Sequence, residues 1–203
     1  IMFNILYMRI AVLALQGAFI EHEKMLQRLG AETFEVRQLS DWYQTKDALV
    51  IPGGESTTQI KLLHELNLYN PVREAILSGL PVFGTCAGLI LLAKSVVGEE
   101  EIERISTMDI SVCRNAYGRQ LGSFYCEDVV DGVGDNIPMT FIRAPYIKCV
   151  TSLDCKPLAI VDGNIVAARQ GNQIVTAFHP ELNDDTRIHE YFMSIVREWV
   201  NKK

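Results

Sequence analysis

Three short segments of the 203-residue chain carry residue types that could do chemistry together. The first is residues 84–88 (GTCAG), a cysteine with a glycine two positions away on either side. In a nucleophile elbow the chain turns sharply between a strand and a helix, so the residues on either side of the nucleophile must have small side chains. Such a turn would place Cys86 at a helix N-terminus, which favours the thiolate, and would free the amide of Ala87 for an oxyanion. The open alternative is a structural cysteine in a tight turn.

The second segment, residues 179–181 (HPE), directly follows the apolar residues 174–178. In an extended chain, positions i and i+2 point the same way. Glu181 could therefore hold one ring nitrogen of His179 while the other nitrogen faces the cysteine, as in a catalytic triad. The alternative is a surface loop with a solvated glutamate.

The third segment, residues 52–57 (PGGEST), contains adjacent glycines whose backbone amides could approach a ligand closely. This suits an oxyanion hole. Alternatively, the glycines only form a turn, and Ser56 with Gln59 forms an S-x-x-Q capping box. No G-K-[ST] follows, so a phosphate-binding loop is excluded, and none of the four histidines begins an H-E-x-x-H zinc motif. We expect neither a metal nor a cofactor.

The elements needed to position these segments alternate along the chain. Residues 9–15 are apolar after Arg9, which is typical of a strand covered on both faces of a parallel sheet, and a short strand is expected at 48–51. Helical spacing of apolar residues predicts helices over 19–29 and 188–200. Further helices are expected at 40–44, around Ile60, Leu63 and Leu66, from Asn70–Pro71 to Gly79, and over 89–94. Short strands are expected at 33–36, 81–84, 122–126, 139–142, 158–161, 165–168 and 174–178.

This alternation predicts a single α/β domain with a strand-rich second half. Each chemical segment follows a predicted strand, and active sites of open parallel sheets gather beyond the carboxyl ends of the strands. The sequence therefore predicts an acyl-transfer site. His22 is expected to pack in the core, whereas His64 and His189 lie on helical patterns without an evident partner.

The composition agrees with a globular protein, since 48% of the residues are hydrophobic and 22% are charged. A net charge of −6 argues against nucleic acid as the main partner. No apolar run approaches the roughly 18 residues of a membrane span. Five cysteines without a C-x-x-C pair argue against a disulfide scaffold, and the apolar segment after Arg9 is too short for a signal peptide. We expect a cytoplasmic protein without membrane association.

Residues 52–54, 84–88 and 179–181, in this order, resemble the class I (triad) glutamine amidotransferases. More narrowly, the chain is similar to the glutaminase subunits of pyridoxal 5′-phosphate synthase. The motifs that carry this likeness are 13–18 (LALQGA), 53–58 (GGESTT), 114–120 (RNAYGRQ), 141–145 (FIRAP) and 179–182 (HPEL). The likeness begins at about Met8, so we interpret residues 8–203 as one glutaminase domain and residues 1–7 as an N-terminal extension.

The resemblance implies a flavodoxin-like three-layer α/β/α domain with a mostly parallel central sheet. It also implies hydrolysis of L-glutamine to L-glutamate and ammonia through a γ-glutamyl thioester. Cys86 would be the nucleophile, His179 the general acid and base, and Glu181 its orienting partner. The amides of Gly54 and Ala87 would form the oxyanion hole.

The glutamine site implied by the resemblance consists of Gly54, Glu55, Ser56, Arg114, Ile142 and Arg143. The resemblance further implies a (β/α)₈-barrel synthase partner in a large heteromeric complex, with Gln16 near the interface and the oxyanion region. Two alternatives remain: another cysteine hydrolase or a glutaminase of a different pathway on the same fold, and a non-catalytic binding subunit.

Overall fold

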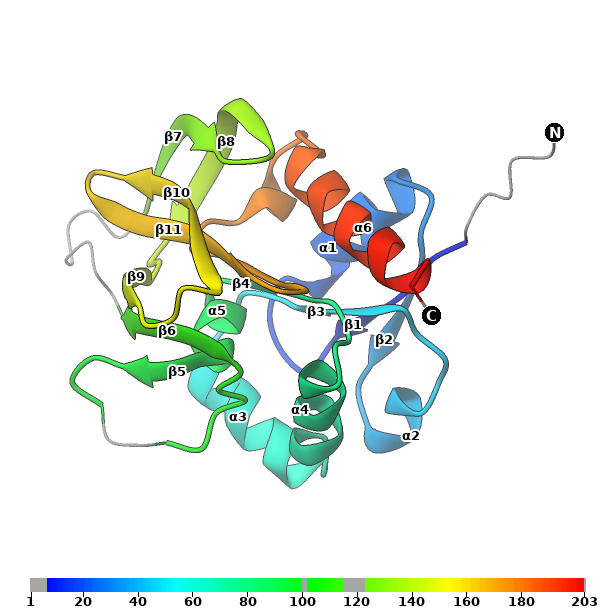
Figure 1. Ribbon diagram of the computed structural model, residues 1–203. Helices are drawn as coiled ribbons and strands as arrows, with labels where there is room; N and C mark the ends of the chain where they lie inside the picture. The colour runs from blue at the N-terminus through cyan, green and yellow to red at the C-terminus, as the bar shows by residue number, and fades with distance from the viewer. Residues whose placement is uncertain (1–6, 100–101, 115–122, 203) are drawn as a thin grey trace, which may run out of the picture.

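A computed structural model describes residues 7–99, 102–114 and 123–202 (Figure 1). Five parallel strands form one half of its main sheet, in the order β2-β1-β3-β4-β12 from the edge inward. They are β1 (Arg9–Leu13), β2 (Glu32–Val36), β3 (Ala48–Ile51), β4 (Val82–Thr85) and β12 (Gln173–Thr176). This strand order is the flavodoxin-like one, and the predicted α/β fold class is confirmed.

Helices cover both faces of this parallel core (Figure 1). On one face lie α1 (Phe19–Arg28) and α6 (Arg187–Val200), and on the other lie α3 (Ser56–Glu65), α4 (Tyr69–Leu77) and α5 (Ala87–Leu92). The short α2 (Leu39–Trp42) lies beside the edge strand β2. Strand β3, predicted at the same residues, is fully buried because helices cover it on both sides.

The second half of the chain extends the sheet with antiparallel and short strands. Beyond β12 the order continues β11-β9-β6-β5, and β10 pairs with β11. These strands are β5 (Ala93–Val96), β6 (Met108–Cys113), β9 (Tyr146–Val150), β10 (Cys155–Val161) and β11 (Asn164–Gln170). A separate hairpin consists of β7 (Ser123–Val130) and β8 (Gly134–Ile142). The predicted strand-rich second half is confirmed.

Two predicted helix boundaries are wrong. The helix expected to run to Lys94 ends at Leu92, because the next residues pair with β6 as strand β5. A short buried apolar run does not by itself distinguish helix from strand. Helix α4 was expected to begin at Asn70–Pro71 but begins at Tyr69, with Leu68 as its N-cap. Pro71 still lies in the first turn, where a backbone N–H has no partner within the helix and a proline is tolerated.

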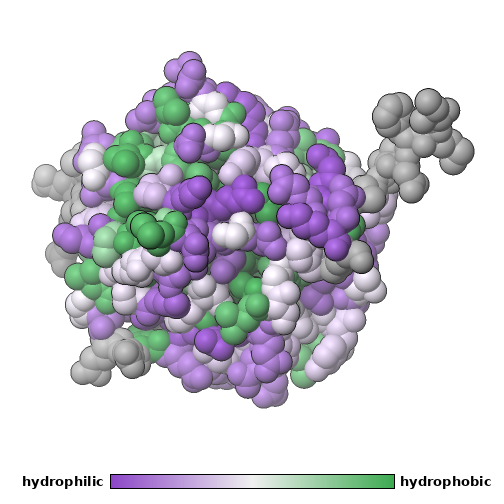
Figure 2. Space-filling view, in the orientation of Figure 1, coloured by the Kyte–Doolittle hydropathy of each residue, from purple (hydrophilic) through white to green (hydrophobic). Residues whose placement is uncertain are grey.

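The surface in Figure 2 mixes hydrophilic and hydrophobic residues in small groups, whereas the apolar core lies between the sheet and its helices. Among the described residues, no helix is long and apolar enough to span a membrane. Residues 1–6 of the predicted extension, and 115–120 of the predicted RNAYGRQ motif, lie outside the described residues.

Candidate active site

The predicted sharp turn forms between β4 and α5, with Cys86 at its apex. Cys86 has φ 49° and ψ −97°, a backbone conformation with positive φ that residues other than glycine rarely adopt. The flanking glycines are sterically required: a Cβ on Gly84 would lie 2.9 Å from the carbonyl group of Gly88, and a Cβ on Gly88 would lie 2.2 Å from the carbonyl oxygen of Ile51. Close packing of the turn against β3 therefore explains the G-x-C-x-G spacing.

Strand β12 brings the histidine to the cysteine. It runs parallel to β4 with Thr176 opposite Thr85, so the chain leaves the sheet beside the turn and reaches His179 three residues later. The N–H of His179 donates to the carbonyl oxygen of Thr140 in β8 at 2.8 Å, which fixes the backbone there. The side chain of Cys86 lies close enough to the ring of His179 to raise its pKa.

Gly53 packs directly against both groups. A Cβ at this position would lie 2.4 Å from Cε1 of His179 and 3.4 Å from Cβ of Cys86. Cys86 and His179 are 8% and 7% exposed, so both are shielded from water but not sealed off from it. The structure thus brings together the sulfur and the imidazole as the sequence predicts.

Glu181 completes the arrangement from the short 3₁₀-helix η1 (Pro180–Leu182). Its Oε1 lies 2.7 Å from Nδ1 of His179. Burial alone lowers the pKa of His179, but hydrogen bonds to Cys86 and Glu181 outweigh it and raise the pKa to about 10. Burial raises the pKa of Glu181, yet the facing His22 and His179 shift it below its usual value. The pair therefore consists of an imidazolium and a carboxylate.

A pocket of about 230 Å³ opens beside the sulfur. All six predicted glutamine-site residues line it, together with Cys86, Ala87, Ile90 and Pro145. Ile90 was not predicted, although it lies three residues after Ala87 and hence on the same face of α5. Pro145 could have been predicted as a pocket residue, because it belongs to the FIRAP motif that also contains Ile142 and Arg143.

The two arginines of the pocket differ in their partners. Arg114 forms an ion pair with Glu99, with Nε 2.7 Å from Oε1, and the second oxygen of Glu99 lies 3.5 Å from Arg104. Arg143 follows β8 with φ 44°, so its backbone is in the left-handed region. Glu99 belongs to the acidic stretch 99–103, and nothing in the sequence predicted its contact with Arg114.

Glu55, and not Ser56, is the N-cap of α3. Its carboxylate accepts the N–H of Thr58 at 2.9 Å and the hydroxyl groups of Thr57 and Thr58. The hydrogen bond from Thr57 contributes most to lowering the pKa of Glu55 to about 2. The alternative capping box of Ser56 and Gln59 is therefore wrong, and Glu55 remains anionic at the pocket wall.

Gln16 lies against the glycine pair next to the pocket. Its Oε1 accepts the N–H of Glu55 at 2.6 Å, and a Cβ on Gly54 would lie 2.3 Å from the same oxygen. The N–H of Ala18 donates to the carbonyl oxygen of Gly53 at 3.0 Å. The loop before α1 is thus bonded to the region predicted as the oxyanion hole.

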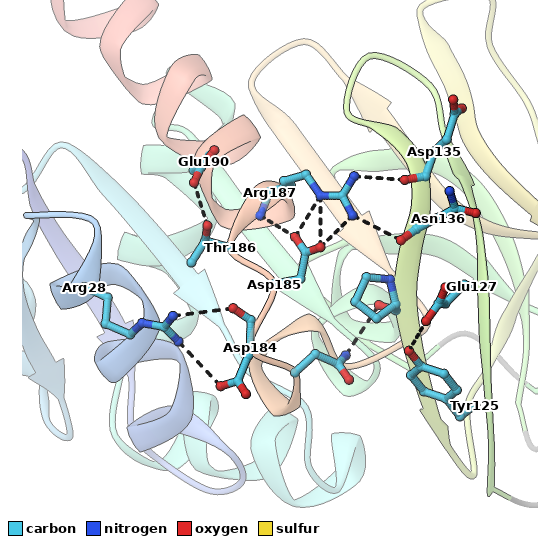
Figure 3. A network of polar contacts seen from close by, with 12 residues as sticks. Arg28, Tyr125, Glu127, Asp135, Asn136, Asp184, Asp185, Thr186, Arg187 and Glu190 are labelled. Atoms are coloured by element: carbon cyan, nitrogen blue, oxygen red, sulfur yellow. Dashed lines mark hydrogen bonds and ion pairs between the residues drawn. The ribbon is translucent and has the colours of Figure 1, made fainter.

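Figure 3 shows how the chain after the glutamate is anchored. Arg187 contacts the carboxylate of Asp185 and donates to the carbonyl oxygens of Asp135 and Asn136 in β8. Asp184 faces Arg28 of α1, with Nη1 3.8 Å from Oδ1. These contacts join the segment that bears Glu181 to both the hairpin and α1.

A cysteine on a strained elbow, beside a glutamate-bound histidine on a flavodoxin-like sheet, is the arrangement that the resemblance to the triad glutamine amidotransferases implies. Residues 12–198 match the model of the SNO glutamine amidotransferase family, and the chain belongs to that family. Among the described residues, no group of three or more His, Cys, Asp or Glu side chains could hold a metal ion.

Curated relatives agree with this assignment. The chain is 57% identical over 194 residues to the pyridoxal 5′-phosphate synthase subunit PdxT of Streptococcus pneumoniae strain CGSP14, covering 94% of this chain and 98% of that protein. It is 56% identical to the protein of the same name from S. pneumoniae strain D39, covering 94% and 99%. The resemblance and the enzyme class predicted from the sequence are confirmed.

Solved structures give the same picture. A crystal structure of a glutamine amidotransferase superposes with a TM-score of 0.86 at 42% identity, covering 92% of this chain and 98% of that one. PurLQS from Thermotoga maritima superposes with a TM-score of 0.63 at 14% identity, covering 93% and 98%. The second likeness concerns the fold alone.

Proposed function

We propose that this chain hydrolyses L-glutamine to L-glutamate and ammonia, and that the ammonia serves the synthesis of pyridoxal 5′-phosphate. Cys86 is the nucleophile, His179 the general acid and base, and Glu181 the residue that orients the histidine. The observation that carries the proposal is that the His179 ring is bonded to Glu181 and lies next to Cys86, with Gly53 packed against both, beside a 230 Å³ pocket that Cys86 lines.

The reaction follows from these positions. The sulfur of Cys86 attacks the carboxamide carbon, and the resulting tetrahedral intermediate collapses when the imidazolium of His179 gives its proton to the departing ammonia. The neutral ring then takes a proton from water, which attacks the γ-glutamyl thioester and releases glutamate and the thiolate. The raised pKa of His179 supports this order, because the ring holds its proton before the attack.

The amides of Gly54 and Ala87 bind the oxyanion in this proposal. Ala87 is the first residue of α5, and the first N–H groups of a helix have no partner within it. Gly54 lines the same pocket with no room for a side chain, because Gln16 lies against it. Loss of one such donor typically costs about 10²–10³ in rate.

The remaining pocket residues bind the amino-acid end of glutamine. The guanidinium groups of Arg114 and Arg143 suit the α-carboxylate, and the anionic Glu55, which lines the same pocket, suits the α-ammonium group. Ser56 and Ile142 complete the wall. The pocket volume agrees with a substrate of this size.

The chain acts with a (β/α)₈-barrel synthase subunit in a large heteromeric complex in the cytoplasm. The names of its relatives, which are subunits of a synthase, support this partner. Ammonia is lost once it reaches bulk water, so the glutaminase must dock tightly. Gln16 is the candidate interface residue, since it contacts Gly54 and Glu55. Residues 8–203 form a single domain in this proposal, because the first and the last strand of the chain, β1 and β12, belong to the same sheet.

Glutamate release, measured with and without the matching synthase, tests the proposal. We expect glutamate with L-glutamine as substrate, at a higher rate when the synthase is present. The second candidate, another cysteine hydrolase or a glutaminase of a different pathway, is favoured by the fold it shares with distant relatives. Turnover of other amides or peptides, or no response to the synthase, would favour that candidate.

A further inference from the structure

Two buried histidines lie next to the triad but belong to neither the triad nor the glutamine pocket. His22 on α1 and His189 on α6 are both fully buried, and Nδ1 of His22 lies 3.0 Å from Nε2 of His189. The burial predicted for His22 is confirmed. His189, which had no evident partner in the sequence, has one in the fold because α1 and α6 cover the same face of the sheet.

The other ring nitrogen of His22 points at the active site. Its Nε2 lies 3.1 Å from Oγ1 of Thr85 and 3.5 Å from Oε2 of Glu181. Oε1 of the same carboxylate is bonded to His179. The carboxylate of Glu181 therefore lies between two imidazoles, one at each oxygen, and within the described residues Oε2 has no full hydrogen bond of its own.

Thr85 connects this group to the glycine pair. Its hydroxyl oxygen accepts the N–H of Gly53 at 2.9 Å, and Gly53 packs against the ring of His179. Thr85 is also the residue before Cys86. His22 thus contacts Thr85, which precedes the nucleophile in the chain, and Glu181, which is bonded to the catalytic histidine.

Burial lowers the pKa of His22; Glu181 raises it by less, and His179 lowers it further. Burial also lowers the pKa of His189 well below its usual value, and His22 adds to that shift. Both rings are therefore neutral at neutral pH, and each has one N–H and one lone pair. His22 acts on Glu181 through the dipole of an N–H group rather than through a full charge.

Only two proton arrangements connect the two rings. In the first, His189 donates from Nε2 to Nδ1 of His22, and His22 directs its Nε2–H towards Thr85 and Glu181. The atom left over is then Nδ1 of His189, which is buried without a partner among the described residues and would be an unprotonated acceptor.

In the second arrangement, every donor is reversed. Nδ1 of His189 becomes an unpaired buried donor, and a lone pair of His22 faces the anionic Oε2 of Glu181 at 3.5 Å. An orphaned buried donor is rarer and more costly than an orphaned acceptor, and a lone pair facing an anion is repulsive. The hydroxyl of Thr85 accepts the N–H of Gly53 and could donate to Nε2 of His22 only in the second arrangement. The repulsion between that lone pair and the buried anionic Oε2, together with the unpaired donor on His189, favours the first arrangement.

We infer that His22 is a positioning residue of the glutaminase reaction: as the neutral Nε2–H tautomer, set by His189, it holds Oε2 of Glu181 so that Oε1 stays on His179. This inference rests on the proposed function and deepens it. Without the N–H of His22, one oxygen of a buried carboxylate loses its facing donor, and Glu181 turns or takes up a proton. His179 is then less well oriented towards the sulfur.

The tautomer is measured on the unmodified full chain, without glutamine or synthase. The protein has four histidines, so ¹⁵N-histidine labelling with long-range ¹H–¹⁵N correlation resolves each ring. We expect His22 and His189 to be neutral Nε2–H tautomers at pH 7 and above. A His22 ring that carries its proton on Nδ1, or that is charged at pH 7, overturns the inference. Neither result bears on whether Cys86 hydrolyses glutamine.

The consequence is measured in the complex with the synthase. We expect His22→Leu to lower kcat about 10- to 100-fold with little change in KM, because His22 does not line the glutamine pocket. The pH dependence of kcat should also move, since His179 loses part of its support. His22→Gln, which keeps an N–H near the same place, should recover most of the activity.

His64→Leu is the matched control, because His64 stacks on Tyr69 away from the pocket. It should keep the wild-type kcat and pH profile. A folded His22→Leu variant with an unchanged kcat and pH profile overturns the inference, and so does a His22→Gln variant as impaired as His22→Leu. If His22→Leu does not fold, the tautomer measurement decides.

Discussion

The backbone N–H of Cys86 donates a 2.8 Å hydrogen bond to the carbonyl oxygen of Thr176, and this bond joins the nucleophile turn to the strand that leads to the histidine. Thr176 ends β12, and the next side chains to reach the site are those of His179 and Glu181. The relative position of sulfur and imidazole therefore depends on the pairing of two sheet strands rather than on a flexible loop.

Replacement of the nucleophile should separate the two halves of the function. We expect Cys86→Ala to abolish glutamate release, because no other cysteine is among the described residues that line the pocket, while binding to the synthase and synthesis from added ammonia persist. Glutamate assay and product assay with ammonium salts check this. Cys149→Ala is the control, since Cys149 is exposed and outside the pocket. Glutamate release by Cys86→Ala would refute the nucleophile assignment.

Removal of the Arg114 charge should weaken glutamine binding. A hydrogen bond to a charged group contributes about 1.5–3 kcal/mol, so Arg114→Gln should raise KM about 10- to 100-fold if Arg114 holds the α-carboxylate. Steady-state kinetics in the complex measure it. Arg169→Gln, at a residue bonded to Tyr191 and away from this pocket, should leave KM unchanged. An unchanged KM in Arg114→Gln would mean that its ion pair with Glu99 is structural only.

The stability of the protein should fall in alkali through His179. Its pKa is raised from 6.5 to about 10, so the stabilisation is fully present below about pH 6.5 and is lost as the pH rises through about 10. Urea unfolding at about pH 7 and pH 10 should therefore show a smaller loss of stability in His179→Gln than in the wild type. His64→Gln serves as the control. Equal losses in all three proteins would contradict the raised pKa.

The elbow should not accept a side chain in place of Gly88. A Cβ there would lie 2.2 Å from the backbone oxygen of Ile51, so one of two backbone segments must move. We expect Gly88→Ala to lower the free energy of unfolding by about 3 kcal/mol and to reduce activity, as forced overpacking does. Gly163→Ala meets no atom within 4 Å but has φ 77°, and should cost about 1–2 kcal/mol with activity retained. Denaturant melts and glutamate assays compare the two, and equal losses would contradict the steric argument.

The sequence by itself determined the local devices of this protein. Glycines on both sides of Cys86, the acid two residues after His179, the apolar strands and the stripe of α6 were all predictable. Each is a consequence of short-range sterics, of the strand period of two or of the helix period of 3.6. The family resemblance added the substrate residues, which would otherwise be read as ordinary surface charges.

Only the tertiary structure determined which of these residues contact one another. Glu55 rather than Ser56 caps α3, Glu99 pairs with Arg114, and residues after Leu92 form a strand because β6 offers it hydrogen bonds. The contact between His22 and His189 likewise exists only because α1 and α6 pack on the same face of the sheet. Such contacts join residues far apart along the chain, and strand order and helix packing, not local pattern, bring them within bonding distance.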